Sequence, residues 1–179
     1  MNCGAAKLLQ RDAQSSMLEA WKAYPRAYDE VLQEVHARVN AAGFATKLDL
    51  SALIAWKHVQ NATWMQELLS LPPLAVQART QSAFSVGLDD KERIDALAGL
   101  PGFGGGEAFT SVLLTAWRPS EYGVFDTNAS KVGWGKVVDA RCTCARSDLV
   151  VYFAHLRRMA KELPAGWTPR DVDMALYGL

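Results

Sequence analysis

The stretch that decides the interpretation of this chain is Leu100-Pro101-Gly102-Phe103-Gly104-Gly105-Gly106-Glu107-Ala108. Ahead of it, Asp89 and Glu92 have the spacing of a capping box, which predicts the start of a helix. Behind it, the apolar run 108–114 predicts a second, buried helix. The sequence therefore predicts two helices joined by a glycine-rich hairpin over about residues 89–116.

The glycines of this hairpin are suited to binding a phosphate group. Glycine adopts positive φ angles readily and lets the backbone come close to a ligand. The amides of the hairpin and the N-terminus of the second helix would then point at a phosphate oxygen. A plain turn needs only one glycine, and each further glycine costs about 0.5–1 kcal/mol relative to alanine. The excess therefore favours close approach to a DNA phosphate over a turn that only joins two helices.

Asp126 is the second feature of interest, and it lies twenty residues beyond Gly106 in a Val-Phe-Asp-Thr segment. The residues around it predict a loop over 117–128 that contains a short extended run. On local grounds alone, Asp126 is expected to cap a helix that begins near Thr127. A capping role does not exclude a catalytic one.

Hairpin and aspartate together resemble the helix-hairpin-helix DNA glycosylases. That family has the pattern Leu-Pro-Gly-hydrophobic-Gly, an apolar helix, and then a catalytic aspartate preceded by an apolar residue. Residues 100–104 match the hairpin, and Asp126 stands where the aspartate belongs. Single-domain bacterial proteins similar to 8-oxoguanine DNA glycosylases resemble this chain most, because they end in a short helix like residues 170–176. The resemblance covers about residues 89–179, and the helical segment 1–49 matches nothing specific.

The resemblance implies a role for each part of the motif. Asp126 would stabilise the positive charge that develops on the deoxyribose as the N-glycosidic bond breaks, and would orient or deprotonate the attacking water. Carbonyl groups of the hairpin would hold a monovalent cation, and no other cofactor is expected. The residues that would bind double-stranded DNA are Leu100, Gly102, Phe103, Gly104, Gly105 and Gly106.

One position departs from the family pattern. Bifunctional members carry a nucleophilic lysine two residues after the second hairpin glycine, where this chain has Gly106. No Schiff base can form from that position, so we expect a monofunctional enzyme that uses water. A lysine from elsewhere could substitute, or catalysis could be lost.

Three further residues are candidates for a pocket or a lyase site, each with a simpler explanation. Lys57 continues the apolar stripe of its helix at helical spacing, so it could reach a site. The simpler explanation is a lysine at the edge of the stripe that packs its aliphatic part there and keeps its charge in water. Trp56 could line a pocket, as could two other tryptophans, but most tryptophans belong to the core. Lys131 could act as a lyase residue and is more simply a solvated or phosphate-contacting lysine.

The composition limits the class of protein. Of 179 residues, 50% are hydrophobic and 21% charged, which is typical of a soluble globular chain. No segment alternates with a period of two, so we expect an all-α fold, as one compact domain or two closely packed helical lobes. Asp49 is expected to cap one of its helices. The net charge of zero predicts a small DNA footprint.

Cysteine usage and the N-terminus bear on the compartment. Three cysteines, an odd number, favour a reducing cytoplasmic environment, and the chain shows neither a secretory signal nor an apolar run of about 20 residues. Cys142, Cys144 and His155 do not have the spacing of a zinc site, so no metal is expected. We also expect a monomer without membrane contact.

Two main hypotheses follow. The first is a monofunctional glycosylase of base-excision DNA repair, acting on a damaged base flipped out of the duplex. The resemblance favours 8-oxoguanine, while uracil, alkylated purines and mismatched adenine stay open. The alternative is a non-catalytic helix-hairpin-helix module that binds DNA or docks a nuclease. A third, without positive support, is a glycosylase fold adapted to another ligand.

Overall fold

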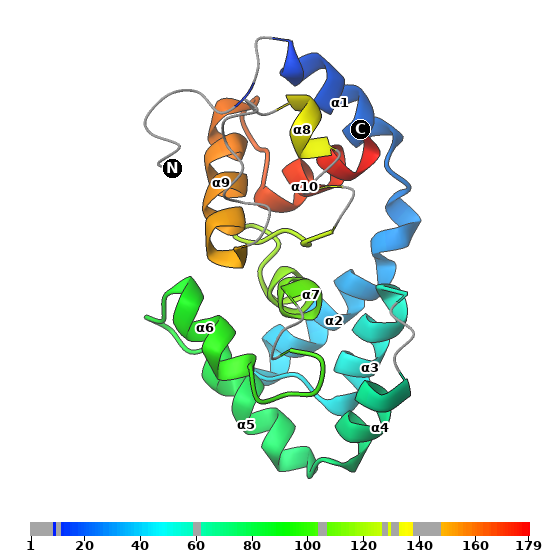
Figure 1. The fold of residues 1–179 in the computed structure, drawn as a ribbon, viewed down its shortest axis with the longest axis vertical. Coiled ribbons are helices and arrows are strands. Elements are labelled where there is room, and N and C mark those ends of the chain that lie inside the picture. Colours follow the sequence, from blue (N-terminus) through cyan, green and yellow to red (C-terminus); the bar gives the residue numbers. More distant parts are fainter. Residues whose placement is uncertain are drawn as a thin grey trace. The chain divides into compact units, whose positions relative to one another are not determined.

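The structure, a computed structural model, describes residues 9, 12–58, 62–103, 107–126, 129, 133–137 and 148–179. Regular structure in these residues is helical and none of them lies in a β-strand, which confirms the all-α prediction (Figure 1). None of the described helices has the length and apolar character needed to cross a bilayer. The elements are α1 (Ala13–Ala23), a 3-10 turn (Arg26–Asp29), α2 (Glu30–Ala42), α3 (Lys47–Trp56), α4 (Ala62–Ser70), α5 (Pro73–Ala83), α6 (Asp90–Leu97), α7 (Glu107–Trp117), α8 (Trp134–Val137), α9 (Leu149–Glu162) and α10 (Pro169–Gly178).

The chain folds into two compact units. Unit 1 combines the two ends of the sequence, Met1–Arg26 and Arg118–Leu179, and unit 2 is the continuous middle, Ala27–Trp117. The hairpin predicted at about 89–116 therefore belongs to unit 2, and Asp126 belongs to unit 1.

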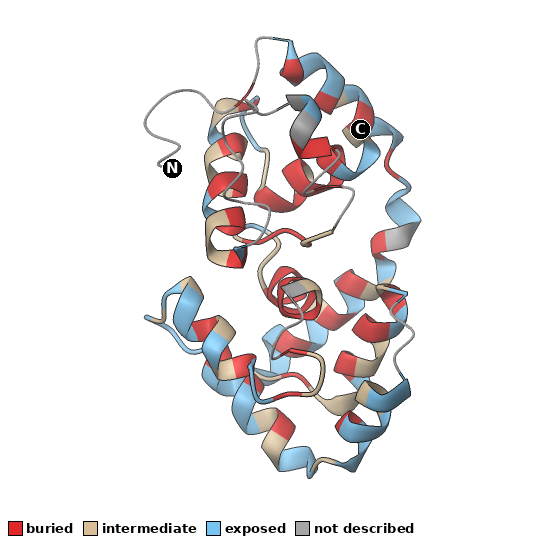
Figure 2. Cartoon of the chain, in the orientation of Figure 1, coloured by how far each residue is buried: buried red, intermediate tan, exposed pale blue. Residues whose placement is uncertain are grey.

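Unit 1 is built around α10. In this unit α10 packs against both α1 and α9. The contact with α1 is close, because a Cβ atom added at Gly178 would lie 3.1 Å from the carbonyl oxygen of Ala20. The inner faces of α9 and α10 are buried (Figure 2). The fully buried side chains of unit 1 include Met17, Trp134, Tyr152, Phe153, Leu156 and Met159.

Unit 2 is built around α7. This helix packs against α2 and α3, and each of its residues from Phe109 to Trp117 is buried (Figure 2). In addition, α3 contacts α2 and α4, while α5 pairs with α6. The segment 1–49, which matches nothing specific in sequence, thus supplies α1 to unit 1 and α2 to unit 2.

Side-chain caps define where several helices begin. Asp89 accepts a hydrogen bond from the backbone of Glu92 at 2.8 Å and Glu92 accepts one from the backbone of Asp89 at 2.7 Å, so the predicted capping box is confirmed. The residue predicted to cap the start of α3, Asp49, was wrong by three positions. Thr46 is the N-cap there, and Asp49 is the partner that completes the box from inside the helix. A threonine hydroxyl can accept the same backbone bond as an aspartate, and the sequence offers both.

Candidate functional site

The described part of the hairpin is a tight turn over residues 100–103. The N–H of Phe103 donates to the carbonyl of Leu100 at 3.0 Å. Pro101 and Gly102 occupy the two central positions, and Gly102 has a φ of +85°. A type II turn requires a positive φ at its third residue and favours proline at its second, so this sequence is well matched to the turn.

Aromatic side chains of the same unit pack against this turn. A Cβ atom at Gly102 would lie 3.1 Å from ring atoms of both Trp64 and Phe109, so a methyl group there would crowd these rings, and the φ angle favours glycine as well. The rings of Trp64 and Phe109 meet edge to face with centroids 5.5 Å apart, and Phe103 lies 6.1 Å from Phe109. We call Trp64, Phe103 and Phe109 the hairpin cluster.

The predicted DNA-binding residues divide into two groups. Leu100 and Phe103 have side chains that are only 2% and 5% exposed, so they anchor the hairpin, and their amides bond within the turn and to Leu97. Gly102 lies between them with its backbone half-exposed. The other three lie outside the described residues: Gly104, Gly105 and Gly106. A cation held by the carbonyl groups of the hairpin stays a prediction.

The segment that carries Asp126 is extended and runs along α9 and α10 of unit 1. Tyr122 and Val124 are buried, whereas Asp126 is half-exposed. Gly123 marks the closest approach, because a Cβ atom there would lie 2.6 Å from a methyl group of Leu156 and 2.8 Å from the Cβ of Asp173. Any larger residue would push the segment away from both helices.

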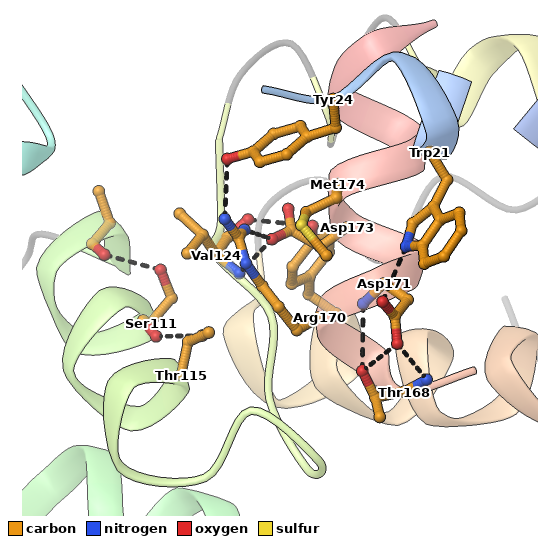
Figure 3. A network of polar contacts seen from close by, with 12 residues as sticks. Trp21, Tyr24, Ser111, Thr115, Val124, Thr168, Arg170, Asp171, Asp173 and Met174 are labelled. Atoms are coloured by element: carbon orange, nitrogen blue, oxygen red, sulfur yellow. Dashed lines mark hydrogen bonds and ion pairs between the residues drawn. The ribbon is translucent and has the colours of Figure 1, made fainter. Parts of the chain in front are cut away.

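The backbone of Val124 is bonded on both sides. Its N–H donates to a carboxylate oxygen of Asp173 at 2.9 Å, and its carbonyl accepts from the hydroxyl of Tyr152 at 3.2 Å. Arg170 forms an ion pair with Asp173 and also donates to the Tyr24 hydroxyl at 2.9 Å (Figure 3). We call Tyr24, Tyr152, Arg170 and Asp173 the Val124 network.

Tyr152 is held in its protonated form. Burial raises the pKa of Tyr152 well above its ordinary value, and the nearby carboxylates of Asp173 and Asp126 raise it further. The hydroxyl therefore remains a hydrogen-bond donor at any working pH. Its ring also meets Phe125 edge to face, with centroids 5.0 Å apart. Tyr152 thus contacts the two residues that directly precede Asp126.

The chain returns to the same two helices after Asp126. A Cβ atom at Gly133 would clash with the carbonyl oxygen of Leu176, so this glycine lets the backbone lie directly on α10. Trp134 follows it, is 1% exposed, and has its ring 6.0 Å from that of Tyr152. Asp126 therefore lies between two points at which the chain is attached to unit 1.

His155 is another buried titratable group in this unit. It lies on α9, with its ring 5.4 Å from that of Trp134. Burial, and then the charge of Arg158, lower the pKa of His155 below its ordinary value. The ring is consequently neutral near pH 7 and acts as a packed aromatic group.

Two of the remaining candidates belong to the other unit, and the third is outside the described residues. Trp56 is a buried residue of unit 2, and Lys57 follows it, half-buried, directly after the end of α3. Lys131 lies outside the described residues. A pocket or lyase role for any of the three stays a prediction.

Sequence reasoning missed Arg170 and Asp173, although both lie in the segment that carries part of the resemblance. The available signal was an arginine and an aspartate three residues apart in a helix that is otherwise largely apolar around Val172 and Leu176. An ion pair at that spacing normally belongs to an exposed helix face. Here both side chains are nearly inaccessible.

Among the described residues, no group of three or more histidine, cysteine, aspartate or glutamate side chains is arranged to hold a metal ion. Cys142 and Cys144 lie outside those residues. No protein-family model, curated protein or solved structure matches this chain. Any proposal about its function therefore depends on the residues and their geometry.

Proposed function

We propose that this protein is a monofunctional DNA glycosylase of the helix-hairpin-helix type, which hydrolyses the N-glycosidic bond of a damaged base flipped out of duplex DNA. The observation that carries the proposal is the half-exposed carboxylate of Asp126, two residues beyond a backbone position that is bonded on both sides. A carboxylate held in this way can act on a substrate without first having to be ordered.

The chemistry assigned to Asp126 follows from the bond that breaks. As the bond between the base and the sugar carbon lengthens, the electron pair leaves with the base and positive charge builds on the deoxyribose. A fixed carboxylate stabilises this charge. Asp126 can then accept a proton from the water that adds to the sugar carbon. The proton taken from the water ends on the departing base, so the products are a free base and an abasic site, and no Schiff base with a lysine is formed.

The hairpin supplies the second half of the proposal. Its turn exposes backbone at Gly102 rather than side-chain charge, and the N-terminus of α7 follows shortly after. Backbone amides and a helix N-terminus can bind a phosphate group without basic residues. This mode of binding accounts for a DNA-binding protein whose net charge is zero.

The substrate class is a damaged base in duplex DNA, with 8-oxoguanine favoured by the resemblance. Extrusion of a base costs a few kcal/mol and costs least at damaged or mispaired positions. Part of the selectivity would therefore come from the DNA itself. The identity of the base has to be measured.

The test uses duplex oligonucleotides that each carry one defined lesion. The wild-type protein is compared with Asp126→Asn and with the control Asp12→Asn, which changes an exposed carboxylate of the same unit that makes no side-chain cap bond. We expect strand breaks after hot alkali with the wild type and the control, and a rate at least about 10²-fold lower with Asp126→Asn. Breaks that appear without alkali would instead reveal a lyase.

One observation favours the alternative of a non-catalytic DNA-binding module. The turn and the hairpin cluster consist of residues from unit 2, whereas Asp126 belongs to unit 1. A module of this kind would bind duplex DNA equally well with aspartate or asparagine at 126. Intact binding by both proteins, with no cleavage of any lesion, would establish this alternative and overturn the glycosylase.

A further inference from the structure

The Val124 network joins parts of the chain that are far apart in sequence. Tyr24 follows α1, Tyr152 lies on α9, and Arg170 and Asp173 lie on α10. Asp173 accepts a hydrogen bond from the N–H of Val124, and the Tyr152 hydroxyl donates to the Val124 carbonyl. Tyr24 acts on Val124 only indirectly, through Arg170 and its ion pair with Asp173 (Figure 3). A single backbone position in a loop thus receives support from three helical regions of unit 1.

The ion pair in this network is expensive to bury. The side chains of Arg170 and Asp173 are 8% and 2% exposed, and desolvation of two charges can exceed their mutual attraction. Apolar residues of similar volume often serve stability as well or better. Apolar residues could not reproduce one feature, which is the hydrogen bond that the N–H of Val124 donates to the Asp173 carboxylate.

Two aspartates on α10 perform different tasks. Asp171 bonds Thr168 at the start of the helix and accepts the indole N–H of Trp21 at 2.8 Å (Figure 3). Asp173 is two residues further along, which rotates it by about 200° around the helix axis. Asp171 therefore supports the helix and its packing, whereas Asp173 supports the segment that leads to Asp126.

We propose that Tyr152 and Asp173, with Asp173 held in place by Arg170, are positioning residues for the carboxylate of Asp126. Tyr152 holds the carbonyl of Val124 and Asp173 holds its N–H. Together they determine where the chain places the side chain of Asp126, two residues later. The proposal rests on the proposed function, because it assigns these residues to the rate of base removal and not to DNA binding.

The expected effect is large because catalysis by a fixed charge depends on its position. A displacement of about 1 Å can lower a rate by about 10²-fold. Loss of the Tyr152 hydroxyl leaves the Val124 carbonyl without its side-chain donor, while the ring and its contacts with Phe125 and Trp134 remain. The segment keeps its packing and loses the bond at the Val124 carbonyl, and Asp173 loses the interaction of its carboxylate with the Tyr152 hydroxyl.

The experiment measures single-turnover base removal with Tyr152→Phe, on the lesion that the wild type cleaves. We expect a rate about tenfold to a hundredfold lower at saturating enzyme, and a duplex Kd within about twofold of the wild-type value. Trp21→Phe is the matched control. Like Tyr152→Phe, it removes a hydrogen bond that an aromatic side chain of unit 1 donates, here to Asp171 on α10, the helix that also carries Asp173. It should leave the rate unchanged.

A second variant, Asp173→Leu, removes the acceptor of the other backbone bond and should show the same separation of rate from binding. If it does not fold, as judged by its thermal transition, Tyr152→Phe alone decides. Equal loss of rate in Tyr152→Phe and Trp21→Phe, or a full rate in Tyr152→Phe, would overturn the positioning role and leave the glycosylase intact. A wild type that cleaves no lesion would overturn the proposed function, and the positioning role with it.

Discussion

At the scale of the residue, Gly102 meets two requirements that can be separated experimentally. It has a φ of +85°, and a Cβ atom there would lie 3.1 Å from Trp64 and Phe109. Gly87 has a similar φ of +90°, but a Cβ atom there would have no neighbour within 4 Å. The two glycines thus have similar φ angles and different surroundings.

We therefore expect different consequences from the same substitution. Gly87→Ala should lower the free energy of unfolding by about 1–2 kcal/mol through backbone strain alone, and should bind duplex DNA as the wild type does. Gly102→Ala adds crowding against the hairpin cluster, so the turn must shift and the affinity for duplex should fall by about tenfold or more. Fluorescence anisotropy with a labelled duplex and thermal unfolding measure the two effects. Equal affinities would exclude the turn from DNA binding.

At the scale of the element, the start of α3 shows how one carboxylate serves both a helix and its neighbour. Asp49 accepts hydrogen bonds from Thr46. Its carboxylate also forms an ion pair with Arg38 of α2, with Nε of Arg38 2.6 Å from Oδ1 of Asp49. Burial alone would raise the pKa of Asp49, but the bonds from Thr46 and Arg38 outweigh it and lower the pKa below its ordinary value. The folded state therefore binds the proton more weakly than the unfolded state does.

This shift predicts an acid dependence of stability. The contribution of Asp49 is complete above about pH 4, where an unfolded aspartate titrates, and is lost as the pH falls through the lower pKa of the folded state. Asp49→Asn should remove this part of the dependence and lower the free energy of unfolding at pH 7 by about 1–2 kcal/mol. Urea unfolding between pH 3 and pH 7 measures both. The control Asp95→Asn changes an exposed carboxylate and should alter neither.

At the scale of the whole molecule, the chain starts and ends in the same unit. Unit 1 needs α1 from the N-terminus to cover α10 near the C-terminus, while unit 2 is built from one continuous stretch. Each unit has its own buried side chains, of which Met17 in α1 and Val35 in α2 are fully inaccessible. Such units commonly open and close as separate cooperative regions.

Core truncations should therefore act within one unit. Met17→Ala should cost about 2–5 kcal/mol and accelerate amide hydrogen exchange in α9 and α10 more than in α3 and α7. Val35→Ala, the reciprocal variant, should accelerate exchange in α3 and α7 instead. Exchange measured by mass spectrometry separates these helices. A uniform acceleration in both variants would mean that the molecule unfolds as a single unit.

The sequence by itself determined the features that depend on neighbouring residues. The helical class, the capping box of α6 and the glycine turn could be predicted, because helix periodicity, caps and turns are set by residues within about four positions of each other. The Thr46 cap was misplaced for a local reason, since Asp49 could occupy the same position. The motif also singled out Asp126, whose catalytic role stays a prediction.

The tertiary structure alone decided what surrounds that aspartate. The bond between Val124 and Asp173 joins residues 49 positions apart, and Gly133 fits against Leu176 across a similar distance in sequence. Local patterns cannot specify such pairs, because which side chain meets which backbone group depends on how α9 and α10 pack. The same packing turned Arg170 and Asp173 from an apparent surface pair into a buried one.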